Sequence, residues 1–170
     1  MYFVGSPFKT LLGISMKKDA FCQYCIDSYR PVENMLKMVP ADKLDWKPGE
    51  SFMRVGELIS HICDGIGSEL KMLISNKWPE HMELGGAMPT CGAAEGLAKL
   101  EKDKTVLREL IAGISEEDFA NREASTPWGA KGTIEKMGFD FREHFTNHKM
   151  QLFTYLKLLG LPVNTQTLYF

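Results

Sequence analysis

Two histidines four residues apart, His144 and His148, are the residues of this sequence with the clearest potential for chemistry. They lie in the segment FDFREHFTNHKMQLFTYLKLLG (139–160), whose apolar residues recur at steps of three and four and so predict a helix. An i, i+4 spacing places both imidazoles on one face of a helix, one turn apart. Neutral imidazole is the commonest protein ligand for zinc, and it also suits nickel, iron and copper.

A third histidine, His61, borders the apolar face of an earlier predicted helix. Three imidazole ligands leave a coordination position for water or substrate, as catalytic metal sites do. We predict that His61, His144 and His148 bind one divalent metal ion. Glu57, one turn before His61, is a candidate to orient an imidazole or to take a proton, and Gln151 to fix an imidazole or a bound water. The alternative is that the three histidines are only hydrogen-bonded.

Four long amphipathic segments must position these residues. Their apolar residues follow a helical period, which predicts helices over 16–39, 52–76, 93–114 and 134–160. Pro31 predicts a kink near Asp27 in the first helix, and Ser51 and Thr133 are the expected N-caps of the second and the last. Ser115 and the acidic residues after it predict a short helical turn over 115–120.

The connections between these helices are predicted to be loops, over 39–51, 77–92 and 125–132. No segment has the alternating pattern of a strand. We therefore predict an all-α, single-domain four-helix bundle over 16–163, with an N-terminal arm over 1–15 and an extended C-terminal tail over 164–170.

Composition narrows the range of partners. The 170 residues are 44% hydrophobic and 25% charged, with a formal net charge of −2. A nucleic-acid or anionic-membrane partner would favour a basic protein, so we expect neither. A signal-peptide pattern is lacking at the N-terminus, and no run approaches about 18 apolar residues, so we expect a cytoplasmic protein.

Other conspicuous residues receive a structural interpretation. Cys22 and Cys25 form a CxxC inside the first predicted helix and are expected to be packed and inert, whereas Cys91, in a Gly-rich loop, is expected to be the most exposed thiol. His81 is expected on the surface. The run Lys99–Lys104 is predicted to be a solvated helix face. The three tryptophans all fall in predicted loops, where they would cover the ends of the core or wall a substrate pocket; they are Trp46, Trp78 and Trp128.

The string His144-x-x-x-His148-x-x-Gln151-Leu152, followed by LKLLGLPV, resembles the last helix of the DinB-like (YfiT-like) four-helix bundles. The upstream segment VPADKLDWKPGESFMRVGELISHI is similar to the same family's Pro-containing loop and histidine-bearing helix. The resemblance covers nearly all of residues 17–163. It implies a homodimer and a divalent ion (Zn, Ni or Fe) on the three histidines.

Related bundles include low-molecular-weight-thiol S-transferases and a mycothiol-dependent isomerase. The resemblance therefore implies a metal-dependent enzyme that activates a thiol or water, acting as a thiol S-transferase or as a hydrolase of a small substrate. A low-molecular-weight thiol is a further expected cosubstrate. Two alternatives remain open: a non-catalytic metal- or ligand-binding stress-response module, and a structural dimerisation bundle.

Overall fold

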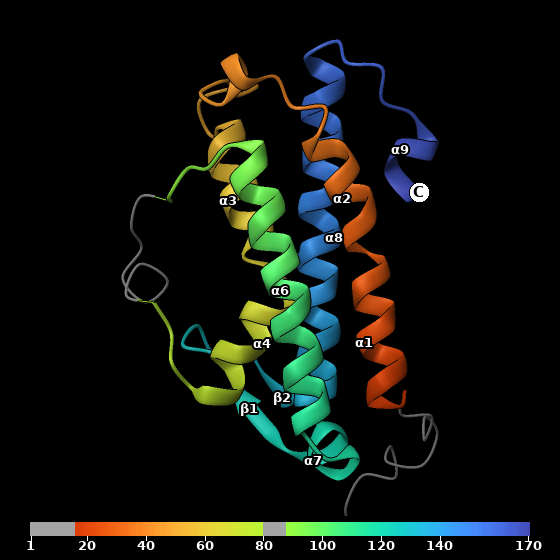
Figure 1. Ribbon diagram of the computed structural model, residues 1–170. Coiled ribbons are helices and arrows are strands. Elements are labelled where there is room, and N and C mark those ends of the chain that lie inside the picture. The colour runs from red at the N-terminus through yellow and green to blue at the C-terminus, as the bar shows by residue number, and fades with distance from the viewer. Residues whose placement is uncertain (1–15, 80–87) are drawn as a thin grey trace, which may run out of the picture.

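In the computed structural model, which describes residues 16–79 and 88–170, long helices run alongside one another in a bundle (Figure 1). The helices are α1 (Lys18–Asp27), α2 (Tyr29–Leu36), the 3-10 helix η2 (Ala41–Lys43), α3 (Val55–Cys63), α4 (Gly65–Ser75), α6 (Ala93–Gly113), α7 (Glu116–Asn121), α8 (Ile134–Leu158) and α9 (Thr165–Tyr169). The pairs α1–α2 and α3–α4 each form one column of the bundle, and α6 and α8 form the other two. The predicted all-α four-helix bundle is therefore confirmed.

The first column breaks where Pro31 predicts it. Pro31 has no N–H to donate to the carbonyl of Asp27, and α1 ends at that residue. Ser28 lies between the two helices, where its N–H and its hydroxyl both donate to the carbonyl of Cys25, at 3.0 and 2.5 Å. The kink near Asp27 is confirmed.

The second column differs from the prediction at two places. Its helix begins at Val55 rather than Phe52, so Ser51 is not its N-cap; the Glu57 carboxylate accepts a bond from the Arg54 N–H at 2.7 Å at this end. It is also interrupted between α3 and α4, where Gly65 has a φ of +57°. That left-handed conformation is readily available to glycine and costs other residues free energy.

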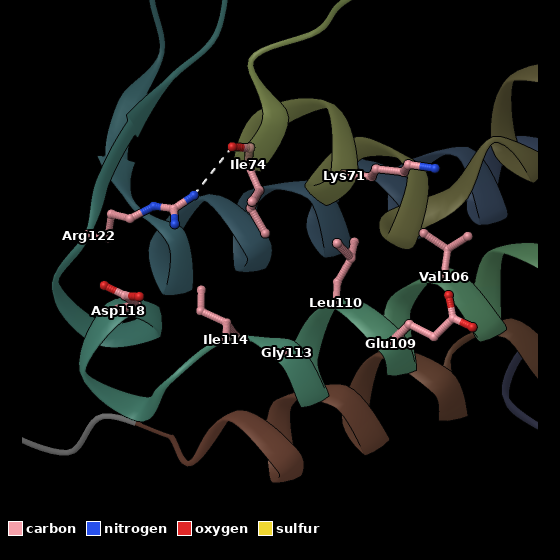
Figure 2. A pocket seen from close by; sticks show the side chains of 9 residues that line it. All are labelled: Lys71, Ile74, Val106, Glu109, Leu110, Gly113, Ile114, Asp118 and Arg122. Carbon is pink, nitrogen blue, oxygen red and sulfur yellow. Dashed lines mark hydrogen bonds between the residues drawn. The ribbon is translucent and has the colours of Figure 1, made fainter.

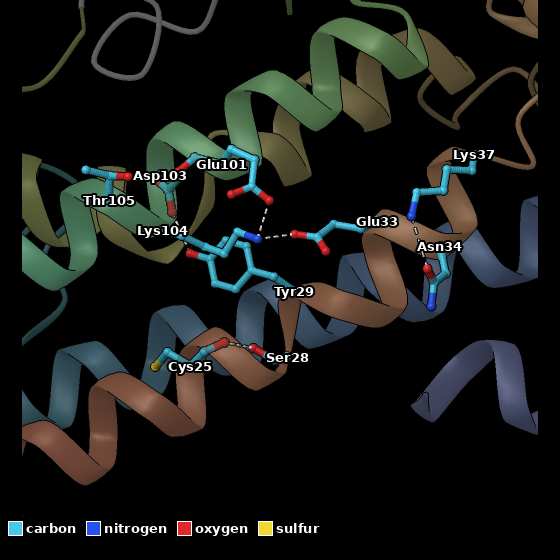
Figure 3. A network of polar contacts seen from close by, with 10 residues as sticks. All are labelled: Cys25, Ser28, Tyr29, Glu33, Asn34, Lys37, Glu101, Asp103, Lys104 and Thr105. Atoms are coloured by element: carbon cyan, nitrogen blue, oxygen red, sulfur yellow. Dashed lines mark hydrogen bonds and ion pairs between the residues drawn. The ribbon is translucent and has the colours of Figure 1, made fainter.

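A buried carboxylate on α6, that of Asp103, accepts hydrogen bonds at this interruption; Figure 3 shows it beside Tyr29. Asp103 is 1% exposed and accepts hydrogen bonds from the N–H groups of Gly67 and Ser68, at 2.8 and 2.6 Å, and from the Ser68 hydroxyl at 2.5 Å. The Tyr29 hydroxyl also donates to Asp103, at 2.5 Å, and accepts from the Ile66 N–H at 3.0 Å. Asp103 and Tyr29 thus satisfy the free N–H groups of the first turn of α4.

The prediction of a solvated face over Lys99–Lys104 is wrong at Asp103 for this reason, whereas Glu101 and Lys102 are exposed as predicted. Besides Asp103, the run contains Leu100, which is buried in the core. The Lys104 ammonium, itself mostly covered, lies 2.6 Å from the Glu33 carboxylate on α2 (Figure 3).

Two further elements were missed by the sequence analysis. Residues 125–132, predicted to be a loop, belong to a hairpin in which β1 (Glu123–Ser125) pairs antiparallel with β2 (Lys131–Thr133). The tail, predicted to be extended, contains α9, whose N-cap Asn164 accepts from the Gln166 and Thr167 N–H groups at 2.8 and 3.3 Å.

The remaining predictions for the helices hold. Ser115 caps α7 by accepting from the Asp118 N–H at 3.0 Å, and Thr133 caps α8 by accepting from the Lys136 N–H at 3.2 Å. None of the helices that the structure describes has the length and hydropathy needed to cross a membrane.

The cysteines are free. Cys25 is fully buried, and Cys22 is partly covered, in keeping with packed thiols. The expectation that Cys91 is exposed is wrong: it is 5% exposed, because its N–H donates to the Gly56 carbonyl at 3.1 Å and draws the loop onto α3.

Candidate metal centre

The three predicted histidines meet at one point between α3 and α8. The Nε2 atom of His61 lies 3.2 Å from that of His144 and 3.1 Å from that of His148, and the last two are 2.9 Å apart. All three side chains are partly buried. Residues 83 and 87 positions apart in the chain therefore present the same ring atom to a common centre.

The spacing of these atoms fits a single ion. Zinc–nitrogen bonds of about 2.0–2.1 Å place neighbouring donors about 3.3 Å apart at tetrahedral angles and about 2.9 Å apart at right angles. The observed separations of 2.9–3.2 Å fall in this range. A small cavity of about 10 Å³ adjoins the three rings, bounded also by Gly65 and Glu69. Within residues 16–79 and 88–170, this is the group of His, Cys, Asp and Glu side chains with metal-ligand spacing.

A chain of hydrogen bonds fixes the tautomer of His148. The Tyr155 hydroxyl donates to the Met53 carbonyl at 3.1 Å, so its oxygen accepts from the Gln151 amide nitrogen at 3.0 Å. The Gln151 amide oxygen consequently faces the His148 Nδ1 atom, 2.9 Å away, and Nδ1 carries the proton. Nε2 of neutral His148 is therefore an unprotonated lone pair aimed at the other two rings.

A carboxylate supports the second ring in the same way. The Glu69 side chain, which is 16% exposed, accepts from His144 Nδ1 at 3.0 Å. In the neutral ring this bond leaves His144 Nε2 unprotonated, with a lone pair that can bind a metal ion. A metal-bound histidine usually donates its other N–H to a carboxylate or carbonyl in this manner, which orients the ring and raises its basicity.

These proton positions favour one of the two interpretations of the cluster. Two unprotonated Nε2 atoms at 2.9 Å repel one another and cannot form a hydrogen bond. Hydrogen bonding among neutral rings therefore does not explain the contact between His144 and His148. A shared cation accounts for all three contacts, and the donor set fits a divalent transition metal.

The surroundings also keep most of the rings neutral. Burial, with a smaller contribution from the neighbouring rings, lowers the pKa of His61 to about 4. Burial likewise lowers the pKa of His148, whereas the hydrogen bond to Glu69 raises the pKa of His144. Burial raises the pKa of Glu69 itself.

The centre opens on one side into a cavity of about 400 Å³. His61, His144 and Glu69 are among its lining residues, and so is Trp128, at the turn of the β1–β2 hairpin. Trp128 packs edge-on against Trp78, with ring centroids 5.0 Å apart. The prediction that tryptophans wall a pocket is thus met by Trp128, whereas Trp46 packs on Tyr155.

A second cavity, of about 330 Å³, lies between α4, α6 and α7 (Figure 2). Its charged lining residues are Lys71, Glu109, Asp118 and Arg122, and Arg122 donates to the Ile74 carbonyl at 3.3 Å. The described lining contains no histidine or cysteine. The histidine cluster therefore borders the first cavity and not this one.

The structure places the two predicted supporting residues differently. Gln151 contacts His148, whereas the described hydrogen bond of the Glu57 carboxylate is to the Arg54 N–H at the start of α3. Glu69 was missed by the sequence analysis. It lies eight residues after His61, a spacing that suits one face of the helix predicted over 52–76, and that spacing was the signal that could have found it. His81 lies outside the described residues.

Comparison with known proteins supports the fold. No protein-family model matches the sequence, and no curated protein matches it either. Among solved structures, a candidate member of the DinB family from Exiguobacterium sibiricum is similar over 91% of this chain and 99% of its own, with a TM-score of 0.64 and 15% identity. A DinB-like protein from Bacillus subtilis is similar over 84% of this chain and 96% of its own, with a TM-score of 0.59 and 21% identity. The resemblance noted in the sequence is therefore confirmed in three dimensions: this chain has the DinB-like fold.

Proposed function

We propose that this protein is a metal-dependent enzyme in which His61, His144 and His148 bind a divalent zinc, nickel or iron ion. The reaction is transfer of a thiol to a small substrate, or hydrolysis of a small substrate. The observation that carries the proposal is the convergence of three Nε2 atoms within 2.9–3.2 Å beside a cavity that His61 and His144 line. A metal centre that borders such a cavity is suited to catalysis, because substrate can reach it.

When bound, the ion would lower the pKa of a thiol or a water molecule and so supply a nucleophile near neutral pH. The protein contributes orientation. Glu69 and Gln151 hold His144 and His148 through their Nδ1 atoms, so that both rings present Nε2 without rearrangement. Tyr155 and the Met53 carbonyl fix the Gln151 amide in turn.

Three protein donors favour the enzyme over a closed structural site, since no fourth His, Cys, Asp or Glu ligand joins them within the described ranges. Substitution with cobalt tests this point. Azide added to the cobalt protein is expected to change its visible absorption spectrum, because a position remains for an outside ligand. An unchanged spectrum would indicate a closed site and would favour the non-catalytic alternative.

Turnover is tested with the zinc-loaded protein on two model reactions, conjugation of 1-chloro-2,4-dinitrobenzene with a panel of thiols and hydrolysis of p-nitrophenyl acetate. One of the two reactions is expected to be faster with the zinc-loaded protein than with the metal-free protein or with His148→Ala. Equal rates in all three preparations would count against an enzyme of either class.

The proposal also includes a homodimer in the cytoplasm with a small-molecule substrate and with neither nucleic acid nor membrane as partner. The net charge of −2 and the family resemblance support it. Light scattering coupled to size-exclusion chromatography tests the dimer, for which a mass of about twice the 19.2 kDa chain is expected.

A further inference from the structure

Apart from the histidines and two carboxylates, the lining of the cavity beside the histidines is apolar. Trp128 and Ala130 of the hairpin and Met137 and Phe141 of α8 line the cavity. Trp128 is 58% exposed, although its ring is held in place by Trp78. A large exposed aromatic ring that is fixed beside a cavity is a common feature of ligand-binding sites, because a bound molecule covers it.

The ionisable lining residues of the cavity, apart from the histidines, are two carboxylates, Glu69 and Asp140. Asp140 lies on α8, where the Lys136 ammonium pairs with it at 2.6 Å. No Lys or Arg of the described residues lines the cavity itself. Because the Lys136 ammonium is already paired with Asp140, a negative charge on the ligand would meet carboxylates and no unpaired cation in the described lining.

We propose that the substrate or cosubstrate of this site is a small molecule with an aromatic or similarly compact apolar group. The end of this molecule that lies farthest from its reacting donor atom carries no negative charge. This proposal rests on the proposed function, because the proposed function places the reacting donor atom of the ligand at the histidine side of the cavity. The apolar group then lies against Trp128 and Phe141. Bulky polyanionic thiols and phosphorylated substrates are disfavoured on this account.

Three thiols that share one donor group provide the test: 2-mercaptoethanol, benzyl mercaptan and 4-(mercaptomethyl)benzoate. Their binding to the zinc-loaded, full-length protein is measured by isothermal titration calorimetry in the presence of a non-thiol reductant. Benzyl mercaptan is expected to bind about tenfold more tightly than 2-mercaptoethanol, because its ring leaves water for an apolar wall. The benzoate is expected to bind several-fold more weakly than benzyl mercaptan because of Asp140.

Two variants assign the effects to residues. Trp128→Ala is expected to remove most of the preference for benzyl mercaptan while leaving the affinity for 2-mercaptoethanol unchanged. Phe52→Ala is the matched control, since Phe52 is a 50% exposed aromatic residue that packs near Tyr155 and does not line the cavity. Asp140→Asn is expected to strengthen binding of the benzoate and to leave benzyl mercaptan unaffected.

The result that would overturn the proposal is equal affinity of the wild-type protein for benzyl mercaptan and 2-mercaptoethanol, or a preference that survives in Trp128→Ala. Binding of the benzoate as tight as that of benzyl mercaptan would overturn the charge requirement. Failure of the proposed function has a different signature: zinc would not bind at all, or none of the three thiols would bind to the zinc-loaded protein.

Discussion

The Nε2 atoms of His144 and His148 face each other at 2.9 Å, although neither carries a proton when the rings are neutral. This contact follows from the partners of the opposite ring nitrogens, a carboxylate on one side and an amide oxygen on the other. A cation relieves the repulsion between the lone pairs, either a proton on His144, whose pKa Glu69 raises, or a metal ion. A metal ion also accounts for the approach of His61 to both rings, and the proposed function rests on it.

Glu69 should set the affinity for that ion. Replacing Glu69 by Gln removes the charge that supports His144, and zinc affinity is expected to fall by about 10- to 100-fold. Competition with a chromophoric chelator measures it. Glu57→Gln is the matched control: it alters the described bond to Arg54 and is expected to lower the free energy of unfolding by about 1 kcal/mol while leaving zinc affinity unchanged. The opposite result, a loss of zinc affinity in Glu57→Gln but not in Glu69→Gln, would assign the support of the histidine cluster to Glu57.

The pH dependence of zinc binding should reflect His144 first. Its pKa is raised by Glu69, so His144 takes up a proton at a higher pH than a free histidine, whereas His61, with a pKa lowered to about 4, stays neutral. The pKa of His148 is also lowered. As the pH falls from 8 through neutrality, one proton should compete with zinc, and log K should decrease by about one per pH unit just below the His144 pKa. A slope of two or more in this window would contradict the assignment.

The break between α3 and α4 should be essential for stability. A Cβ atom at Gly65 would lie 2.3 Å from the Asp103 carboxylate, at a φ of +57°, so Gly65→Ala should lower the free energy of unfolding by more than about 2 kcal/mol. Gly113→Ala is the matched control, because Gly113 ends α6 with open space around it. It should leave stability unchanged or raise it by up to about 1 kcal/mol. Urea denaturation measures both, and equal effects would refute this account of the break.

Asp103 should act through the hydrogen bonds that it accepts from α4 and Tyr29. Asp103→Ala leaves the Gly67 and Ser68 N–H groups and the Tyr29 hydroxyl without their partner. The free energy of unfolding is therefore expected to fall by about 3–5 kcal/mol. Tyr29→Phe removes one donor and should cost less, about 1–2 kcal/mol. If Tyr29→Phe proved as destabilising as Asp103→Ala, the carboxylate would not be the main support of the break.

The thiols should be inert in the native protein. Burial raises the pKa of Cys25 to about 12, so at pH 8 only about one molecule in ten thousand carries its thiolate. Burial also raises the pKa values of Cys22, Cys63 and Cys91. Ellman's reagent is expected to react rapidly only after unfolding in guanidinium, with partly covered Cys22 the fastest in the native state. Rapid reaction of Cys25 in the native protein would contradict this view.

The sequence predicted the elements that depend on local periodicity. The apolar stripes gave the columns of the bundle, Pro31 gave the break after Asp27, and the i, i+4 spacing placed His144 and His148 on one face. These features are encoded within a few residues. The three-histidine cluster also needed His61, whose position at the edge of an apolar face was visible in the sequence.

The features that were missed depend on contacts between distant segments. Asp103 looks like part of a solvated charged run, and only the approach of α4 to α6 buries it. Glu69 becomes a partner of His144, 75 residues away in the chain, because α4 packs against α8. The hairpin that carries Trp128 has strands of only three residues, too short to show an alternating pattern.

Metal binding by the three histidines is tested by elemental mass spectrometry of protein purified without an affinity tag or chelator. We expect about one equivalent of zinc, nickel or iron per chain in the wild type and in His81→Ala, and loss of that metal in His148→Ala. Absence of metal from the wild type, with no uptake of added zinc or nickel, would contradict this expectation and would leave a bundle whose histidines serve another purpose.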